Sequence, residues 1–182
     1  MFEKRDEERQ LDQDQPIGLL QSKFPDLELE SSPGSRVRIS TLLQGNVVVY
    51  LYPATGVPGK DPAPDWDWIP GAVGCTVQSL GYKTLYADFK ALGWEVIGIS
   101  GQDSAEQAEF SRRNDIPFAL LSDKDFQLTE VLRLPTFQAG GRTYVKRMAI
   151  IVERGIIKKV FYPVEAPADN ASTILKWLSS AR

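Results

Sequence analysis

The sequence predicts an α/β fold in which helices flank a central mixed β-sheet. Two almost wholly apolar, β-branched segments, NVVVYLY at 46–52 and WEVIGIS at 94–100, have the composition of strands buried on both faces. A helical pattern separates them, and such a crossover makes the two strands parallel. Farther along, KRMAIIV and IIKKVFY flank the tripeptide ERG at 153–155, which is typical of an antiparallel hairpin. A sheet with both kinds of pairing is mixed.

Length and charge indicate one domain. The chain has 182 residues, enough to bury a substantial core, and the domain is predicted to span 17–182. Residues 1–16 carry mixed charge and are predicted to be an N-terminal extension. A net charge of −3 argues against a nucleic-acid partner, and the apolar runs are too short for a membrane span. The first residues lack the apolar run of a secretory signal, so we expect a cytoplasmic location.

The first half of the domain begins with a predicted hairpin at 26–40, where DLELE and RVRIS surround SSPGS. After the strand at 46–52, a segment rich in proline and glycine at 53–71 has no periodicity and is predicted to be a long loop. A single helix is then expected over 76–92, with a kink near Gly81. Its buried face is predicted to contain Val77, Gly81, Leu85, Phe89 and Leu92.

The second half continues the alternation of helices and strands. A short helix is expected at 104–114, a strand at 117–122 and another short helix from Asp125. Residues 133–144, RLPTFQAGGRTY, are predicted to be a loop. After the hairpin described above, NASTILKWL predicts a terminal amphipathic helix whose cap is Asn170 or a nearby serine.

The residue counts exclude many kinds of catalytic site. There is no histidine, which removes Ser-His-Asp and Cys-His catalysis and nearly all catalytic zinc sites. The single cysteine, Cys75, cannot form an intramolecular disulfide or a thiolate cluster. Neither GxGxxG nor GxxxxGK[ST] is present, so no cofactor and no metal is expected. The thiol and the carboxylates are the remaining candidates for chemistry.

Cys75 lies where a thiol could be activated. The order of elements is that of a thioredoxin-like fold, in which ligands bind at the carboxyl ends of the parallel strands. Cys75 follows a central strand and begins a helix, where unpaired N–H groups and the helix dipole stabilise a thiolate. Arg147, at the start of a later strand, can face the same edge and strengthen this effect. Two alternatives remain open: Cys75 as a small buried hydrophobe and Arg147 as a surface arginine.

The chain resembles the peroxiredoxins, and within them the thiol-specific antioxidant and bacterioferritin-comigratory (Q-type) members. The resemblance covers about residues 17–181 and rests on VVVYLYP, PGAVGCT, WEVIGIS, FALLSD and KRMAIIVERGIIKKVFYP. It implies a peroxidase in which Cys75 attacks a hydroperoxide and becomes a sulfenic acid. It further implies that Arg147 stabilises the thiolate and the polarised O–O bond, that Pro53 shields the thiol, and that N–H groups around Gly74 complete the pocket.

The sequence departs from the family pattern in three places. Ala72 stands where the family has a hydroxyl residue three positions before the cysteine; Thr55 is the first candidate to replace that hydroxyl and Thr76 the second. Residues 56–69 are an insertion. Leu80 stands where Q-type relatives often carry the resolving cysteine, so an external thiol (thioredoxin, glutaredoxin or a small thiol) must reduce the oxidised protein.

Two further interpretations stay open. Trp66 and Trp68 in the insertion are more typical of cover over a core, although Trp68 is also a candidate for substrate binding. The alternative to a peroxidase is a non-catalytic thioredoxin-like module that senses redox state or binds a partner, which the missing hydroxyl at Ala72 favours. Family habit suggests a homodimer.

Overall fold

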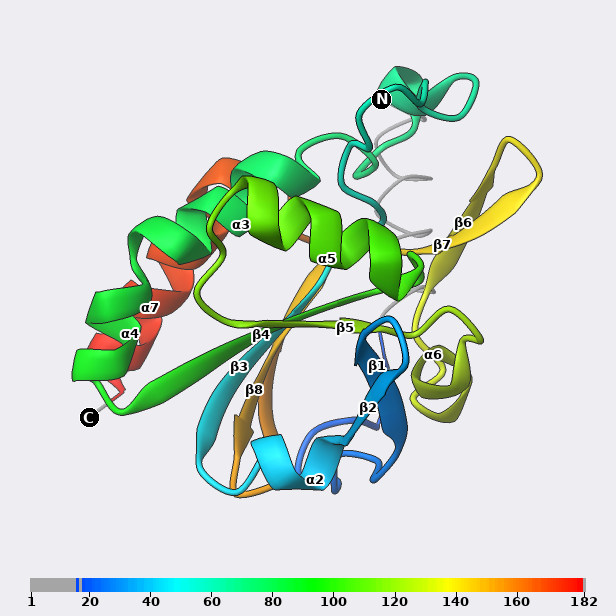
Figure 1. Cartoon of the computed structure of the whole chain (residues 1–182). Helices are drawn as coiled ribbons and strands as arrows, with labels where there is room; N and C mark the ends of the chain where they lie inside the picture. The colour runs from blue at the N-terminus through cyan, green and yellow to red at the C-terminus, as the bar shows by residue number, and fades with distance from the viewer. Residues whose placement is uncertain (1–15, 17, 182) are drawn as a thin grey trace, which may run out of the picture.

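A computed structural model of the chain describes residue 16 and residues 18–181. The predicted extension at 1–16 therefore lies, apart from Pro16, outside the described residues. Seven strands form one sheet in the order β2-β1-β5-β4-β3-β8-β9 (Figure 1). Their bounds are β1 (Glu28–Ser32), β2 (Ser35–Arg38), β3 (Asn46–Leu51), β4 (Trp94–Ser100), β5 (Ala119–Ser122), β8 (Met148–Glu153) and β9 (Ile156–Phe161).

The pairing confirms the mixed sheet. β3, β4 and β5 are parallel, with Val48 opposite Val96 in the β3–β4 pair. β8 runs antiparallel to β3, placing Ile150 opposite Val49, and β9 is antiparallel to β8. The hairpin β1–β2 joins the other edge antiparallel to β5. The apolar segments that predicted buried strands therefore form the interior of the sheet.

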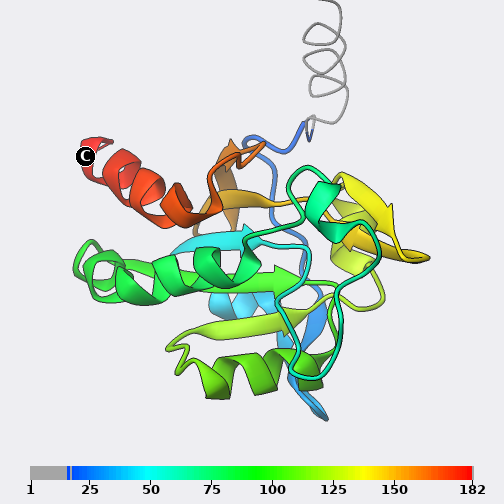
Figure 2. The ribbon, with the colours of Figure 1, turned by 90° about the horizontal axis from the view of Figure 1, so that it is seen from above.

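Helices cover both faces of this sheet (Figures 1 and 2). Side chains of β3 alternate between two apolar clusters, with Val48, Tyr50 and Tyr52 in one and Val47, Val49 and Leu51 in the other. The first cluster packs against α3 (Cys75–Thr84), α4 (Tyr86–Ala91), α5 (Ser104–Arg113) and α7 (Asn170–Ser180). The second packs against α2 (Ile39–Leu42) and α6 (Gln127–Val131).

The helical segment after Cys75 differs from the prediction. Instead of one helix over 76–92 with a kink near Gly81, α3 and α4 are separated at Leu85. The predicted buried face is also wrong for α3, because Val77 is 48% exposed while Gln78 and Tyr82 are fully buried. The reason is that these two polar side chains bond to Asn170 of α7. A Cβ atom at Gly81 would be in ordinary van der Waals contact with the same region, 3.4 Å from the carbonyl oxygen of Ala168 and 3.7 Å from the Cβ atom of Ala171 in α7.

The prediction of a loop over 133–144 is wrong as well. β6 (Thr136–Ala139) and β7 (Arg142–Val145) form an antiparallel hairpin outside the main sheet (Figure 1). The insertion packs on it: the Trp66 ring, in the short helix η1 (Trp66–Trp68), lies 4.9 Å from that of Tyr144 and 5.9 Å from that of Phe137. This tertiary contact covers aromatic side chains of the hairpin, and the sequence of residues 133–144 alone does not predict it.

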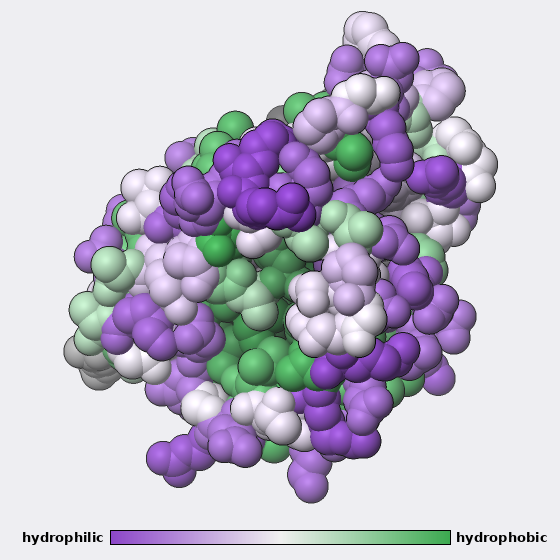
Figure 3. Space-filling view, in the orientation of Figure 1, coloured by the Kyte–Doolittle hydropathy of each residue, from purple (hydrophilic) through white to green (hydrophobic). Residues whose placement is uncertain are grey.

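The last helix begins as predicted at Asn170, but this residue does not cap it. A short helix η2 (Pro167–Asp169) precedes α7, and the Asn170 side chain is buried against α3. Among the described residues, no helix has the length and apolar character needed to cross a membrane. On the face shown in Figure 3, apolar side chains gather toward the centre and polar ones cover most of the periphery.

Candidate active site

Cys75 is the first residue of α3 and is 3% exposed. Gly74 precedes it with a φ of +106°, a conformation that glycine adopts without steric cost. The thiol lies 3.5 Å from the carbonyl oxygen of Ala72, to which it donates a hydrogen bond. The backbone turn at 71–74 ends the long loop between β3 and α3. It places the sulfur at the N-terminus of α3, where backbone N–H groups are unpaired.

Arg147 lies immediately before β8 and is 3% exposed, so it is not a surface arginine. Its Nη2 atom is 3.2 Å from the Cys75 sulfur. The same nitrogen approaches the carbonyl oxygens of Gly71 at 3.1 Å, Ala72 at 3.4 Å and Val73 at 3.0 Å. The guanidinium therefore holds the turn that leads into α3 and contacts the thiol at the same time.

One donor of Arg147 remains unused. Its Nε atom is buried and has no hydrogen-bond partner among the described residues. A buried N–H without a partner costs free energy, so such atoms are rare unless a ligand uses them. Nη2, for its part, has two hydrogens shared among four acceptors. A free donor beside a buried thiol is suited to an oxygen atom that enters the site.

Two tyrosines from the end of β3 form a wall of the site that sequence reasoning missed. Tyr50 and Tyr52 are fully buried, and their rings stack at a centroid distance of 5.5 Å. Burial raises the pKa of both hydroxyls, and the neighbouring Cys75 thiolate adds to this effect. Both hydroxyls therefore stay protonated; that of Tyr50 donates to Ser79 Oγ at 3.0 Å, and that of Tyr52 accepts from Gln107 Nε2 at 3.4 Å. Their alternate positions in NVVVYLY were the available signal.

A second missed group links Arg147 to α7. The Gln78 amide oxygen accepts a short hydrogen bond from Nη1 of Arg147. The Gln78 amide nitrogen donates to Asn170 Oδ1 at 3.0 Å, and the Tyr82 hydroxyl donates to the same oxygen at 2.7 Å. Gln78 and Tyr82 are three and seven residues after Cys75, on the same helix face, so spacing from the cysteine was the signal.

The other residues predicted for the site are placed in different ways. Pro53 is buried directly after β3. Thr55 is buried, but its hydroxyl donates to Gln102 Oε1 at 3.1 Å and its N–H to the same atom at 2.8 Å. No hydrogen bond among the described residues joins Thr55 to Cys75, so the structure directs this hydroxyl to Gln102. Thr76 is half-buried in the first turn of α3.

Trp68 is not part of the buried site. Its side chain is 85% exposed, whereas its neighbour Trp66 packs against the β6–β7 hairpin. The exposed Trp68 side chain does not cover the buried thiol, and its role in substrate binding stays a prediction. Ala72 contributes through its backbone: the side chain is fully buried and the carbonyl oxygen faces both Cys75 and Arg147.

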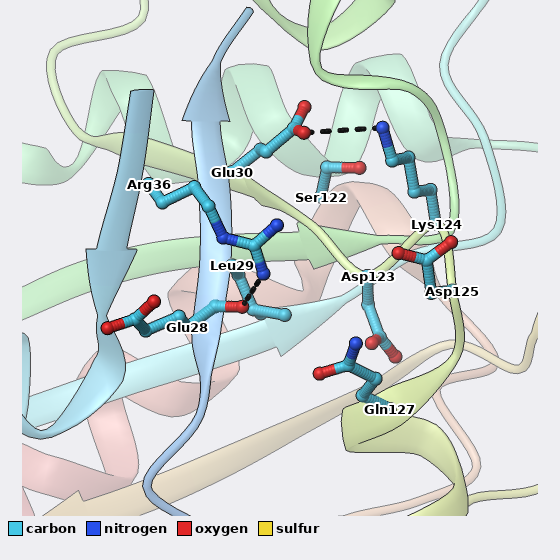
Figure 4. A pocket seen from close by; sticks show the side chains of 9 residues that line it. All are labelled: Glu28, Leu29, Glu30, Arg36, Ser122, Asp123, Lys124, Asp125 and Gln127. Atoms are coloured by element: carbon cyan, nitrogen blue, oxygen red, sulfur yellow. Dashed lines mark hydrogen bonds and ion pairs between the residues drawn. The ribbon is translucent and has the colours of Figure 1, made fainter. Parts of the chain in front are cut away.

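A second depression lies between β1, β2 and the start of α6 (Figure 4). Lys124 pairs with Glu30 at 3.3 Å, and Arg36 donates to the backbone oxygen of Glu28 at 2.8 Å. None of its lining residues hydrogen-bonds to Cys75 or Arg147 in the described part of the chain. Within the same residues, no group of three acidic or cysteine side chains is arranged to hold a metal ion.

Relatives in plants share the sequence pattern. The putative chloroplastic peroxiredoxin Q of Oryza sativa subsp. indica is 31% identical over 160 residues, covering 87% of this chain and 66% of that protein. The chloroplastic peroxiredoxin Q of Arabidopsis thaliana is 30% identical over 161 residues, covering 86% of this chain and 65% of that protein. The chain thus spans slightly less than two thirds of the length of these relatives.

Solved structures share the fold. Peroxidoxin BcpB from Mycobacterium tuberculosis superposes with a TM-score of 0.72 at 23% identity, covering 90% of this chain and 97% of that one. The bacterioferritin comigratory protein of Xanthomonas campestris gives a TM-score of 0.69 at 20% identity, covering 88% and 92%. The predicted thioredoxin-like fold is confirmed.

The match to a family model extends over most of the domain. The model of the Redoxin family covers residues 20–175, which include the thiol, the arginine and every strand of the main sheet. Together with the plant relatives, this match confirms the resemblance stated from the sequence motifs. The chain belongs to the redoxin family, as a peroxiredoxin Q-type member with a single cysteine.

Proposed function

We propose that the protein is a thiol-dependent peroxidase in which Cys75 reduces hydrogen peroxide or an alkyl hydroperoxide. The observation that carries this proposal is the 3.2 Å contact between the Cys75 sulfur and Arg147 Nη2, both buried at the start of α3. A guanidinium and a helix N-terminus both favour the thiolate, which is the reactive form of cysteine. A peroxidase also needs a hydrogen-bond donor for the peroxide oxygens, and the unpartnered Nε of Arg147 supports this part of the proposal.

The proposed reaction begins with the thiolate. Its sulfur attacks the terminal oxygen of the hydroperoxide, forming an S–O bond while the O–O bond breaks. The leaving oxygen takes the electron pair and a proton and departs as water or an alcohol, and Cys75 becomes a sulfenic acid. Donors of Arg147 stabilise the negative charge that develops on the leaving oxygen.

Recycling needs two external thiol groups, because Cys75 is the only cysteine. The first thiolate attacks the sulfenate sulfur, water leaves, and a mixed disulfide forms. The second thiol attacks this disulfide, releases the Cys75 thiolate and leaves the reductant oxidised. A dithiol protein such as thioredoxin or glutaredoxin, or two molecules of a small thiol, supplies these groups.

The names of the relatives support the proposal. The plant proteins are peroxiredoxin Q, and the report on the Xanthomonas campestris protein concerns its alkyl peroxide reduction activity. For the present chain, an alkyl hydroperoxide substrate, a homodimer and a cytoplasmic location are proposals. The two plant relatives are chloroplastic by name, which describes those proteins.

Intact mass and stopped-flow measurements test the peroxidase. One equivalent of hydrogen peroxide should add about 16 Da, or about 32 Da after over-oxidation to the sulfinic acid. With dithiothreitol or thioredoxin and its reductase, the protein should consume peroxide in repeated turnovers. Cys75→Ser is the control and should do neither. An unmodified mass under excess peroxide would show that Cys75 is an inert thiol.

A further inference from the structure

Among the residues that the structure describes, no carboxylate forms a hydrogen bond or an ion pair with the Arg147 guanidinium. Its acceptors are the backbone oxygens of Gly71, Ala72 and Val73, the Gln78 amide oxygen and the Cys75 sulfur. None of the six ion pairs found among residues 18–181 includes Arg147. A buried positive charge without an anion is strongly unfavourable. The group that can supply the anion is therefore Cys75.

The other ionisable side chains near the thiol do not compete for this role. Tyr50 and Tyr52 face Cys75 from β3, and burial raises the pKa of both hydroxyls, so they remain neutral. On α3, the residues that face inward with Cys75 are Gln78, Ser79 and Tyr82, of which Tyr82 also has a pKa raised by burial. From α7, the facing polar side chain is the neutral Asn170.

Gln78 holds the guanidinium without neutralising it. Its amide oxygen accepts from Arg147 Nη1, on the nitrogen that does not contact the sulfur. Gln78 is fully buried, so water does not compete for this bond. A glutamate would occupy nearly the same volume but would bring a full negative charge to the guanidinium. The neutral amide leaves that charge available to the thiolate.

Asn170 sets the direction of the Gln78 amide. Asn170 Oδ1 accepts from Gln78 Nε2 at 3.0 Å and from the Tyr82 hydroxyl at 2.7 Å. An oxygen that receives two donors fixes Nε2 toward α7, and the amide oxygen of Gln78 must then point to Arg147. Asn170 is 5% exposed, so the arrangement is enclosed between α3 and α7.

We infer that Gln78, oriented by Asn170, is a positioning residue that fixes the Arg147 guanidinium through a neutral acceptor and so leaves the Cys75 thiolate as its counter-ion. The inference rests on the proposed peroxidase function for its consequence, but its physical content concerns the thiolate and can be measured without peroxide. Gln78 acts through Arg147 and does not touch the reacting sulfur.

Gln78→Glu tests the neutrality of the acceptor. At neutral pH we expect the ultraviolet absorbance of the thiolate to fall and alkylation by iodoacetamide to slow about tenfold, because the new carboxylate competes as counter-ion. Gln127→Glu is the matched control, since it adds the same charge at an exposed position of α6 and should react as the wild type does. A Gln78→Glu variant whose thiolate absorbance and alkylation rate equal those of the wild type overturns the inference.

Gln78→Met and Asn170→Ala test the positioning. Both keep the charge of the site unchanged but remove the acceptor or the group that orients it. We expect peroxide oxidation of Cys75 to slow at least about fivefold more than alkylation, because only the peroxide reaction needs the guanidinium in a defined place. Equal slowing of both reactions, or no slowing, overturns the positioning role. Circular dichroism and thermal melting establish that each variant is folded.

The two hypotheses fail in different ways. If the wild type alkylates as an activated thiol but is not oxidised by peroxide, the peroxidase proposal is wrong and the Gln78→Glu alkylation result still decides the inference. If the wild type turns over peroxide and Gln78→Glu matches it in both assays, the inference alone is wrong.

Discussion

Gly74 lies so close to Pro167 that a Cβ atom on the glycine would be 2.7 Å from Pro167 Cγ and 2.9 Å from its Cβ. Gly74 is the residue before α3, and Pro167 opens the short helix before α7. The N-terminus of α3 therefore packs against the short segment that precedes Asn170. Any residue larger than glycine would push these two segments apart.

Gly74→Ala should destabilise the protein and slow peroxide oxidation together. It adds the cost of φ +106°, about 1–2 kcal/mol, and the overlap with Pro167, about 1–3 kcal/mol. Gly34→Ala is the matched control because Gly34 also has a positive φ, +75°, but has no atom within 4 Å of the added Cβ. Urea unfolding and stopped-flow oxidation measure both effects. Equal losses of stability in the two variants would contradict the role of the Pro167 contact.

Arg147→Lys should slow peroxide oxidation about 100-fold, because an ammonium keeps the charge but loses the planar set of donors. Alkylation by iodoacetamide should slow far less, since that reaction needs the thiolate but no donor for oxygen. Arg142→Lys, at an exposed position of β7, is the control. If both reactions of Arg147→Lys slow by the same factor, the arginine acts only on the thiolate. If neither peroxide oxidation nor alkylation slows in Arg147→Lys, the arginine has no role in the reaction of Cys75.

Thr55→Val should leave peroxide oxidation within about threefold of the wild-type rate. In the structure this hydroxyl donates to Gln102 Oε1 at 3.1 Å. Because Thr55→Val removes that hydrogen bond, the variant protein should be about 1 kcal/mol less stable than the wild type. Thr76→Val removes the hydroxyl of the second candidate, in the first turn of α3, and its rate of peroxide oxidation is measured alongside that of Thr55→Val. A loss of more than tenfold in Thr55→Val would instead show that its hydroxyl serves the peroxide, as the sequence suggested.

Leu80→Cys should not form a rapid disulfide with Cys75. Five residues along an intact helix separate the two Cα atoms by at least about 7.5 Å, beyond the usual range for a disulfide. The bonds of Gln78 and Tyr82 to Asn170 hold this part of α3 against α7. Adding Asn170→Ala should speed the reaction by easing local unwinding. Thiol counts and intact mass after one equivalent of peroxide measure this, and fast bridging in the single variant contradicts a firmly held helix.

Asp123 should make stability fall as pH rises from about 3.9 through the raised pKa of its carboxyl in the folded protein. Burial raises the pKa of its carboxyl in the folded protein, despite hydrogen bonds from Thr129 and the N–H of Leu128. The folded state then binds the proton more tightly than the unfolded chain, so stability present below about pH 3.9 is lost as pH rises through the higher folded pKa.

Unfolding free energies of wild type and Asp123→Asn, measured across this range, test the point. The wild type should lose stability relative to Asp123→Asn as pH rises. Asp61→Asn, at an exposed position of the loop after β3, controls for the change in net charge. Parallel curves for the wild type and Asp123→Asn would show that the carboxyl titrates alike in both states.

The apolar runs of the chain were sufficient to predict the sheet and the position of the thiol. Strands 46–52 and 94–100 were predictable because both faces of an interior parallel strand are buried. Such a strand is an almost continuous apolar run, which is visible in the sequence alone. The position of Cys75 followed from the same reasoning, since it comes after a central strand and at the start of a helical pattern. Local composition was sufficient for these features.

The side of α3 that faces inward and the surroundings of the arginine depend on contacts between segments that are distant in the chain. Gln78 and Tyr82 are polar and lie outside the face predicted to be buried, yet both are buried because Asn170, more than 80 residues away in the chain, supplies their partner. The β6–β7 hairpin was missed for a similar reason, as Trp66 of the insertion covers it. A polar residue can be buried when a partner meets it, and periodicity in one segment carries no information about that partner.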